Sequence, residues 1–450
     1  MSFAFRGRPS KVRRATHLPC AKLPRSFPPG KWWMVATSNL SVTSGAPDTQ
    51  SVGTPFQRIT SVDILRGLVM VIMALDHTRD YFSNLQFPPE DLTRTSGILF
   101  FTRFITHYCA PVFFLLAGTG AFLAVARGNS VKQISRFLWT RGLWLMFLEL
   151  TIVGFGWTFV LPFNAASILW ALGWSMVALA MFVRLPIRWI AGIGLTMIAF
   201  HNLFDRVNPA WFGNFSWLWM LLHSPGFYPI TPNTGVVVLY PVIPWIGVMA
   251  AGYSLGAILL RPDRKKLLLG IGGAATLLFV LLRGINHYGN GIAGLPFGVP
   301  IGVGPWSVQR SFTLTAVSFF NTLKYPPSLD FLLMTLGPAL IALALFEGLN
   351  TQRGVGRVLL VFGRVPMFYY VIHIYLIHLM AILVAEVVHQ PVAWLWRGGF
   401  FFSSTPAGYG HGLLFVYAMW ILAVVVLYLP CRWFMEFKKR HPDWNWLSYV

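Results

Sequence analysis

Apolar residues gather into ten long runs that begin near residue 61 and recur as far as residue 433. A helix of about 20 apolar residues is long enough to cross a bilayer core about 30 Å thick. The pattern therefore predicts an all-α, polytopic membrane bundle. The expected spans are 61–82, 104–126, 137–158, 165–183, 187–204, 236–260, 267–282, 329–347, 357–388 and 411–433.

Basic residues alternate in density between successive connections. Lys and Arg crowd the connections after the second and sixth spans and the segment after the last span, whereas the connection after the third span has none. The positive-inside rule then predicts that both termini are cytoplasmic. We expect a membrane domain over 58–435 and a short cytoplasmic tail over 436–450.

The first 57 residues differ from the rest. They are rich in Pro, Ser and Arg and show no helical period, which predicts a disordered basic tail. They contain no apolar core before a small-residue cleavage site, so we do not expect a cleaved signal peptide. A start codon at Met34 would account for the unusual composition of residues 1–33.

Composition supports the membrane class. The chain is 56% hydrophobic and 11% charged, which is too little polar surface for a soluble globule of 450 residues. The net charge of +21 comes mainly from the N-terminal tail and from the loops on one side of the membrane. It therefore indicates topology and predicts no nucleic-acid partner. The three cysteines, at 20, 109 and 431, have no metal or redox spacing, and we expect no disulfide and no metal.

The first span ends in a polar cluster, Asp76, His77, Arg79 and Asp80. At i,i+3 spacing on a helix, Asp80 can orient the His77 imidazole and Arg79 can neutralise Asp76. A neutral imidazole held by a carboxylate suits a general base near pH 7. Ionisable groups within a membrane segment indicate a functional site, although an ion-pair patch that ends the helix is the structural alternative.

Two later spans carry further candidates. His107 opens the second span at the same predicted depth as His77, and Tyr370 and His373 share a face of the ninth. The outer loops 205–235 and 283–328 are long and contain Trp, so they can lie in the interface or cover an acceptor site. No Walker motif, H-E-x-x-H, nucleophile elbow or paired C-x-x-C is present.

Several ordered motifs over about residues 56–435 resemble the bacterial branch of the heparan-α-glucosaminide N-acetyltransferase-like membrane proteins. That group was long catalogued as a domain of unknown function and belongs to a wider set of transmembrane acyltransferases. The motifs are RITSVDILRGLVMVIMALDHTRDYF, ITHYCAPVFFLLAG, YPVIPWIGVMAAGYSLG, LKYPPSLDFLLMTLGP and FGRVPMFYYVIHIYLIH.

The resemblance implies transfer of an acyl group from cytoplasmic acyl-CoA to a sugar on the far side. In the lysosomal enzyme, an Asn corresponds to His77 and a carboxylate to His107, whereas the late-helix Tyr and His match Tyr370 and His373. Its proposed catalytic His lies in the first lumenal loop. The corresponding loop here, 83–103, has no His.

From these observations we hypothesise an acyl-CoA-dependent acyltransferase of the bacterial inner membrane, with acetyl-CoA as the expected co-substrate. Its acceptor would be a hydroxyl or amine of a glycan or small molecule, and no metal is required. The expected catalytic residues are His77, Asp80, Asp76 and His107. Tyr370, His373 and Arg79 would position the thioester and the acceptor. The CoA phosphates would lie near Arg66, Arg141 and Arg364.

Two other classes remain open. A proton-coupled transporter of an envelope sugar or lipid would use Asp76, His77 and Asp80 as a relay, although no internal repeat is visible. A non-catalytic subunit of an envelope assembly would need none of them. Membrane lipid surrounds the protein under every hypothesis, and a homodimer is compatible with the sequence.

Overall fold

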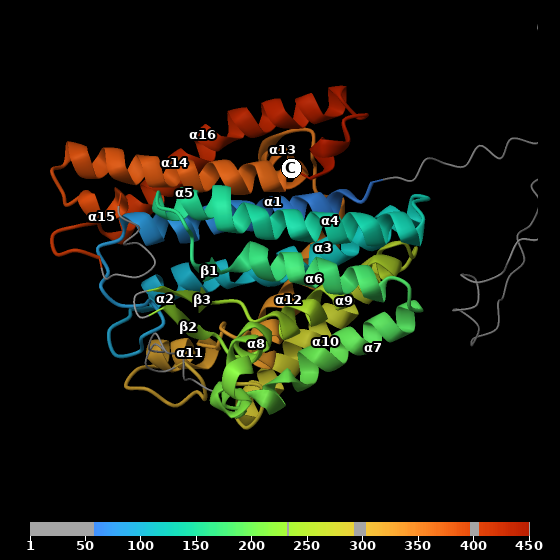
Figure 1. The fold of residues 1–450 in the computed structure, drawn as a ribbon, viewed down its shortest axis with the longest axis horizontal. Coiled ribbons are helices and arrows are strands. Elements are labelled where there is room, and N and C mark those ends of the chain that lie inside the picture. The colour runs from blue at the N-terminus through green and yellow to red at the C-terminus, as the bar shows by residue number, and fades with distance from the viewer. Residues whose placement is uncertain (1–57, 232–233, 292–302, 397–404, 450) are drawn as a thin grey trace, which may run out of the picture. The chain divides into compact units, whose positions relative to one another are not determined.

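The computed structural model describes residues 58–231, 234–291, 303–396 and 405–449 (Figure 1). The predicted disordered tail and the alternative start at Met34 lie outside the described residues. In the described part the long helices run side by side, with α2, α11 and α15 at one end of the bundle and the start of α1 at the other. The helices of seven or more residues are α1 Thr60–Phe82, α2 Gly97–Phe104, α3 Cys109–Ala126, α4 Val131–Leu148, α6 Ile168–Phe182, α7 Ile187–Phe200, α8 Ser216–Leu222, α9 Val242–Leu259, α10 Arg264–Ile285, α11 Phe312–Phe320, α12 Leu329–Leu345, α13 Gly354–Arg364, α14 Pro366–Val387 and α16 Leu413–Arg440.

Helix covers most of each expected span, although the spans expected at 165–183 and 236–260 begin in short strands. Among the described residues, eight helical stretches are long and apolar enough to cross a membrane, so the count of ten and the orientation of the termini stay predictions. The expected ninth span is two helices, α13 and α14, because Pro366 cannot donate to the preceding turn. Helix α6, with 15 residues, is apolar but short.

Helix α1 is the centre of the described bundle. It packs against α13, α14, α16 and α3, and these neighbours bury most of its length. Its backbone meets that of α13 directly: a Cβ on Gly67 would lie 1.9 Å from the Leu359 carbonyl oxygen. Glycine at this position therefore permits the approach, and the surrounding helices keep the charged residues of α1 away from lipid.

A π-helical turn, η2 (Glu149–Val153), interrupts the third membrane segment between α4 and α5 (Gly154–Thr158). The fully buried Glu149 carboxylate accepts hydrogen bonds from the Ser167 hydroxyl and from the Leu169 backbone N–H, the latter at 2.9 Å. The acid thereby satisfies the start of α6, where unpaired backbone donors would otherwise be buried. Ile168 lies between the two residues that bond to Glu149, so this contact fixes its position at the start of α6.

Short strands, which an all-α prediction did not include, lie in the connections before α6 and before α9. Strands β1 (Ala165–Ala166), β2 (Gly226–Thr231) and β3 (Thr234–Val238) form one sheet in the order β1-β3-β2. Pairing of β1 with β3 is parallel, and that of β2 with β3 is antiparallel. The sheet brings the chain after β3, at Leu239 and Tyr240, over the end of α1.

Candidate functional site

A polar cavity of about 160 Å³ surrounds the end of α1. The side chains that line it come from α1, α2, η1, α3, α5, α6, α14 and the two outer loops. They include all four residues of the predicted cluster and several residues from distant parts of the chain. The lining residues are Met73, Asp76, His77, Arg79, Asp80, Arg103, Thr106, Cys109, Ala110, Trp157, Ser167, Ile168, Leu239, Tyr240, Lys324, Tyr325 and Tyr370.

Two guanidinium groups neutralise Asp76. Arg79 Nη2 lies 2.9 Å from Asp76 Oδ1, at the i,i+3 spacing that the sequence suggests. Arg103 Nη1 lies 2.8 and 2.7 Å from the two Asp76 oxygens and comes from α2, across the first outer loop. A buried carboxylate is tolerated when it is paired and hydrogen-bonded, so Asp76 anchors the wall of the cavity.

His77 lies between Asp80 and the aromatic side of the cavity. Its Nδ1 is 3.6 Å from Asp80 Oδ2, slightly beyond hydrogen-bond distance. Its ring meets Trp157 edge-on with centroids 4.5 Å apart, and the His373 ring lies 5.3 Å away. The geometry brings together His77, Asp80 and His373, as the sequence suggests. A small movement of Asp80 would make the orienting bond.

His107 occupies a different position from the one expected. Its side chain is 1% exposed, packs against Phe331 and is not among the residues that line the cavity. Its Nε2 lies 3.8 Å from Glu90 Oε1, and Glu90 in turn accepts from Arg103 Nε at 2.8 Å. Burial would raise the pKa of Glu90, but the Arg103 guanidinium outweighs it and holds that pKa well below its usual range.

A second, larger cavity of about 280 Å³ opens between α1, α3, α4, α6 and α14. Its wall is mostly apolar, with Arg66 and Arg141 as its charged members. Ile168 and Tyr370 line both this apolar cavity and the polar cavity. The two cavities therefore adjoin at these side chains.

The third expected phosphate ligand, Arg364, lies beside this cavity rather than in its wall. Asp63 gathers three guanidinium groups: Arg58 Nε at 2.6 Å, Arg66 Nη1 at 3.1 Å and Arg364 Nε at 3.9 Å. One carboxylate shared among three arginines leaves a net positive charge at the end of the bundle where α1 begins.

Sequence reasoning missed Arg103, Trp157, Lys324 and Tyr325 as cavity residues. Lys324 and Tyr325 belong to the LKYPPS motif, which carries part of the family resemblance but has no spacing that indicates chemistry. Lys324 Nζ lies 5.1 Å from the centre of the Tyr325 ring. Burial would raise the pKa of Tyr325, but Lys324 and Arg103 lower it below its ordinary value.

The polar cluster also offers ligand atoms for a cation. One oxygen or nitrogen of each of Asp76, His77 and Asp80 lies within 4.8 Å of the others. Arg79 and Arg103 already compensate the two carboxylates, which weakens any attraction for a metal ion. The contacts of the cluster thus favour acid–base chemistry over metal binding.

Comparison with known proteins identifies the family of the chain. Residues 58–285, half of the chain, match the family model described as heparan-alpha-glucosaminide N-acetyltransferase, catalytic. The match includes α1 and both predicted histidines of the first two spans and ends with α10. No curated protein matches the chain. With eight apolar helices among the described residues that are long enough to cross a membrane, the chain is a multi-pass membrane protein and belongs to the heparan-alpha-glucosaminide N-acetyltransferase catalytic family.

Proposed function

We propose that this protein transfers an acyl group, most simply acetyl, from cytoplasmic acyl-CoA to a hydroxyl or amine of a sugar or glycan on the other side of a bacterial inner membrane. The observation that carries the proposal is the junction of the two cavities. An apolar cavity with two arginines and a polar cavity with a carboxylate–imidazole cluster share Ile168 and Tyr370. A transfer across a membrane needs such a meeting point, because donor and acceptor enter from opposite sides.

The apolar cavity suits the donor. Arg66 and Arg141 present guanidinium groups, which pair with phosphate in a fork geometry, and Arg364 adds charge nearby. The apolar wall beyond them suits the pantetheine arm and a short acyl chain. The positive-inside rule assigns this end to the cytoplasm, where acyl-CoA is available.

The polar cavity suits the acceptor. Asp80, Arg79, Lys324 and Tyr325 offer charged and hydroxyl groups to a sugar, and Trp157 offers a flat apolar face. In the transfer step His77 removes the proton from the attacking hydroxyl or amine, and a bond forms to the thioester carbonyl carbon. The carbon–sulfur bond then breaks, and CoA leaves as a thiolate that takes up the proton.

Tyr370 is the best-placed donor to the developing oxyanion, because its side chain lies where the cavities join. His373 is less suited to that role. Its Nδ1 lies 3.0 Å from the Tyr369 carbonyl oxygen and must therefore carry the ring proton, which leaves Nε2 as an acceptor. We assign His373 to the support of His77, and His107 to the support of Glu90 and Arg103.

The test compares two neighbouring tyrosines in purified protein with radiolabelled acetyl-CoA and a panel of amino sugars and glycans. Tyr370→Phe should lower kcat by about 10²–10³, the usual effect of losing one oxyanion donor. Tyr369→Phe is the matched control, because Tyr369 is also fully buried but lines neither cavity. His77→Ala should abolish the base-dependent step. Equal rates for the two tyrosine variants would contradict the role of Tyr370.

A binding experiment separates the enzyme from a proton-coupled transporter. CoA should raise the thermal midpoint of the wild-type protein, because a ligand that binds only the folded state stabilises it by mass action. Arg66→Gln with Arg141→Gln should remove most of that rise. If CoA has no effect on the wild-type midpoint, the donor assignment is wrong and the transporter hypothesis gains support.

A further inference from the structure

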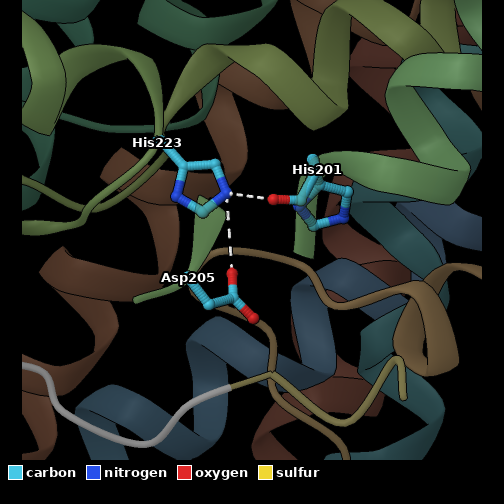
Figure 2. Close-up of side chains that lie close together, drawn as sticks. All are labelled: His201, Asp205 and His223. Atoms are coloured by element: carbon cyan, nitrogen blue, oxygen red, sulfur yellow. Dashed lines mark hydrogen bonds and ion pairs between the residues drawn. The ribbon is translucent and has the colours of Figure 1, made fainter. Parts of the chain in front are cut away.

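Two histidines and an aspartate converge away from the two cavities, at the end of the fifth membrane segment (Figure 2). His201 begins the short helix η3 (His201–Phe204) that extends α7, and Asp205 follows it directly. His223 is the residue after α8. The first two side chains have i,i+4 spacing on nearly helical backbone, which places them on one face, and the third returns from the outer loop.

The distances fit a small transition-metal ion. His223 Nε2 lies 3.5 Å from Asp205 Oδ1, and one ligand atom of each of the three residues lies within 4.8 Å of the others. Ligands about 2.1 Å from a tetrahedral Zn²⁺ lie about 3.4 Å from one another. The Asp205–His223 pair already has that separation. The His201 ring nitrogen lies within 4.8 Å of the other two ligand atoms and completes the set by moving closer to them.

His201 and His223 are buried, Asp205 is half-buried, and three of the polar atoms in the cluster lack a hydrogen-bond partner. The side chains of His201 and His223 are each 1% exposed, and neither ring nitrogen of His201 has a hydrogen-bond partner. Asp205 Oδ1 also accepts no hydrogen bond, and no Lys or Arg of the described residues lies within 4 Å of this carboxylate. Buried polar atoms without partners are costly, so this arrangement calls for a cation.

The contrast with the end of α1 is informative. Asp76 and Asp80 also lie beside a histidine, but two arginines supply the positive charge there. At Asp205 the available neighbours are imidazoles, whose neutral nitrogens are metal ligands rather than counter-ions. The two clusters thus have similar composition, but arginines neutralise the carboxylates at the end of α1 and no described arginine neutralises Asp205.

Neighbouring groups hold the ligands in place. Asn202 Nδ2 donates to Asp205 Oδ2 at 2.9 Å, which leaves Oδ1 directed toward His223. The side-chain oxygen Oδ1 of Asn202 accepts from the Leu329 N–H at 2.8 Å, so α12 fixes this amide. Trp219 stacks on the His223 ring with centroids 5.5 Å apart. Outer-shell contacts of this kind orient metal ligands in proteins.

We propose that His201, Asp205 and His223 bind one Zn²⁺ ion, with water as the fourth ligand, and that the ion fastens the outer loop after α8 to the end of α7. Nitrogen and carboxylate ligands in a buried tetrahedral set favour zinc over magnesium or calcium. At present His223 Nε2 donates to the His201 carbonyl oxygen at 2.8 Å. Zinc binding moves that ring proton to Nδ1 and replaces the hydrogen bond with a metal bond.

The proposal is tested on the full-length protein in detergent, with a tag that lacks histidine. After chelator treatment, limiting Zn²⁺ and gel filtration, wild type should retain about one zinc per chain by mass spectrometry. Asp205→Asn and His223→Gln should lose at least 90% of it, whereas His389→Gln, at an exposed position, should match wild type. Zinc should also raise the thermal midpoints of wild type and His389→Gln, but not those of Asp205→Asn and His223→Gln.

A second measurement needs no variant and guards against misfolding. Co²⁺ added to the metal-free wild type should give the strong visible bands of four-coordinate cobalt, and Zn²⁺ should remove them by competition. The proposal is overturned if wild type retains no more zinc than the variants. A cobalt spectrum identical to that of Co²⁺ in buffer would overturn it equally.

Discussion

The ion pair between Asp76 and Arg103 tests how strongly burial couples charges at the polar cavity. Arg103 Nη1 lies 2.7 Å from Asp76 Oδ2, and the two side chains are 10% and 12% exposed. A surface pair, Arg261 and Asp263, has a similar distance of 2.8 Å, but its side chains are 53% and 44% exposed. The two pairs have the same chemistry and differ in their surroundings.

The expected magnitudes differ accordingly. Two unit charges about 4 Å apart attract by about 4 kcal/mol at an effective dielectric constant of 20. Removal of one partner from a buried pair typically destabilises a protein by about 3–5 kcal/mol, because the other charge stays buried. Arg79 still contacts Asp76 at 2.9 Å and offsets part of this loss. We therefore expect Arg103→Met to lower the free energy of unfolding by about 3 kcal/mol.

The assay is reversible unfolding in mixed micelles, with the denaturing detergent as titrant and Trp fluorescence as the signal. Arg261→Met is the control, and it should show no measurable loss, because solvent and salt screen that pair. The double variant Asp76→Asn, Arg103→Met should recover part of the stability, because the carboxylate charge at residue 76 is removed, although Glu90 still lacks its Arg103 partner. If Arg103→Met is no more destabilising than Arg261→Met, then burial does not strengthen the pair and the reasoning fails.

Two further predictions concern packing and pH. Gly67→Ala should destabilise the protein by about 3 kcal/mol, because the new Cβ would lie 1.9 Å from the Leu359 carbonyl oxygen and α1 would have to move away from α13. The control Gly273→Ala places its Cβ in open space and should not destabilise the protein. Equal unfolding midpoints for the two variants would contradict this reasoning. Burial raises the pKa of the Asp205 carboxyl from 3.8 to about 6. In metal-free protein the charged carboxylate therefore lowers the free energy of unfolding above pH 6. This loss of stability disappears as the pH falls toward 4 and the carboxylate is protonated. Asp205→Asn should therefore stabilise metal-free protein by about 2 kcal/mol at pH 7.5 and by almost nothing at pH 4; a gain that does not depend on pH would refute the shift.

The helices of the membrane domain could be predicted from the sequence because lipid imposes a simple rule. A segment in the bilayer must satisfy its own backbone and present apolar side chains, so each span leaves a continuous apolar run in the sequence. The same rule makes a cluster such as Asp76, His77, Arg79 and Asp80 conspicuous. The i,i+3 contacts within that cluster follow from helix geometry alone, and the structure contains them.

The rest of the candidate site depends on contacts between segments far apart in the chain. The partner of Asp76 is Arg103, 27 residues later, and Lys324 reaches the cavity from a loop that follows six more expected membrane segments. Their approach depends on loop paths and on the short sheet, which hydrophobic periodicity does not encode. The same limit explains His107, whose depth was predictable but whose side-chain direction depended on packing against Phe331.

By itself, then, the sequence determined the class of the protein, the positions of its helices and the polar end of α1, because burial in lipid acts on each segment separately. Only the tertiary structure decided that Tyr370 lies where two cavities meet, that two arginines neutralise Asp76 and that His223 returns to Asp205. These are distances across the bundle, and they are fixed by how closely helices pack and where loops return. The hydrophobic pattern along the chain does not specify how closely helices pack or where loops return.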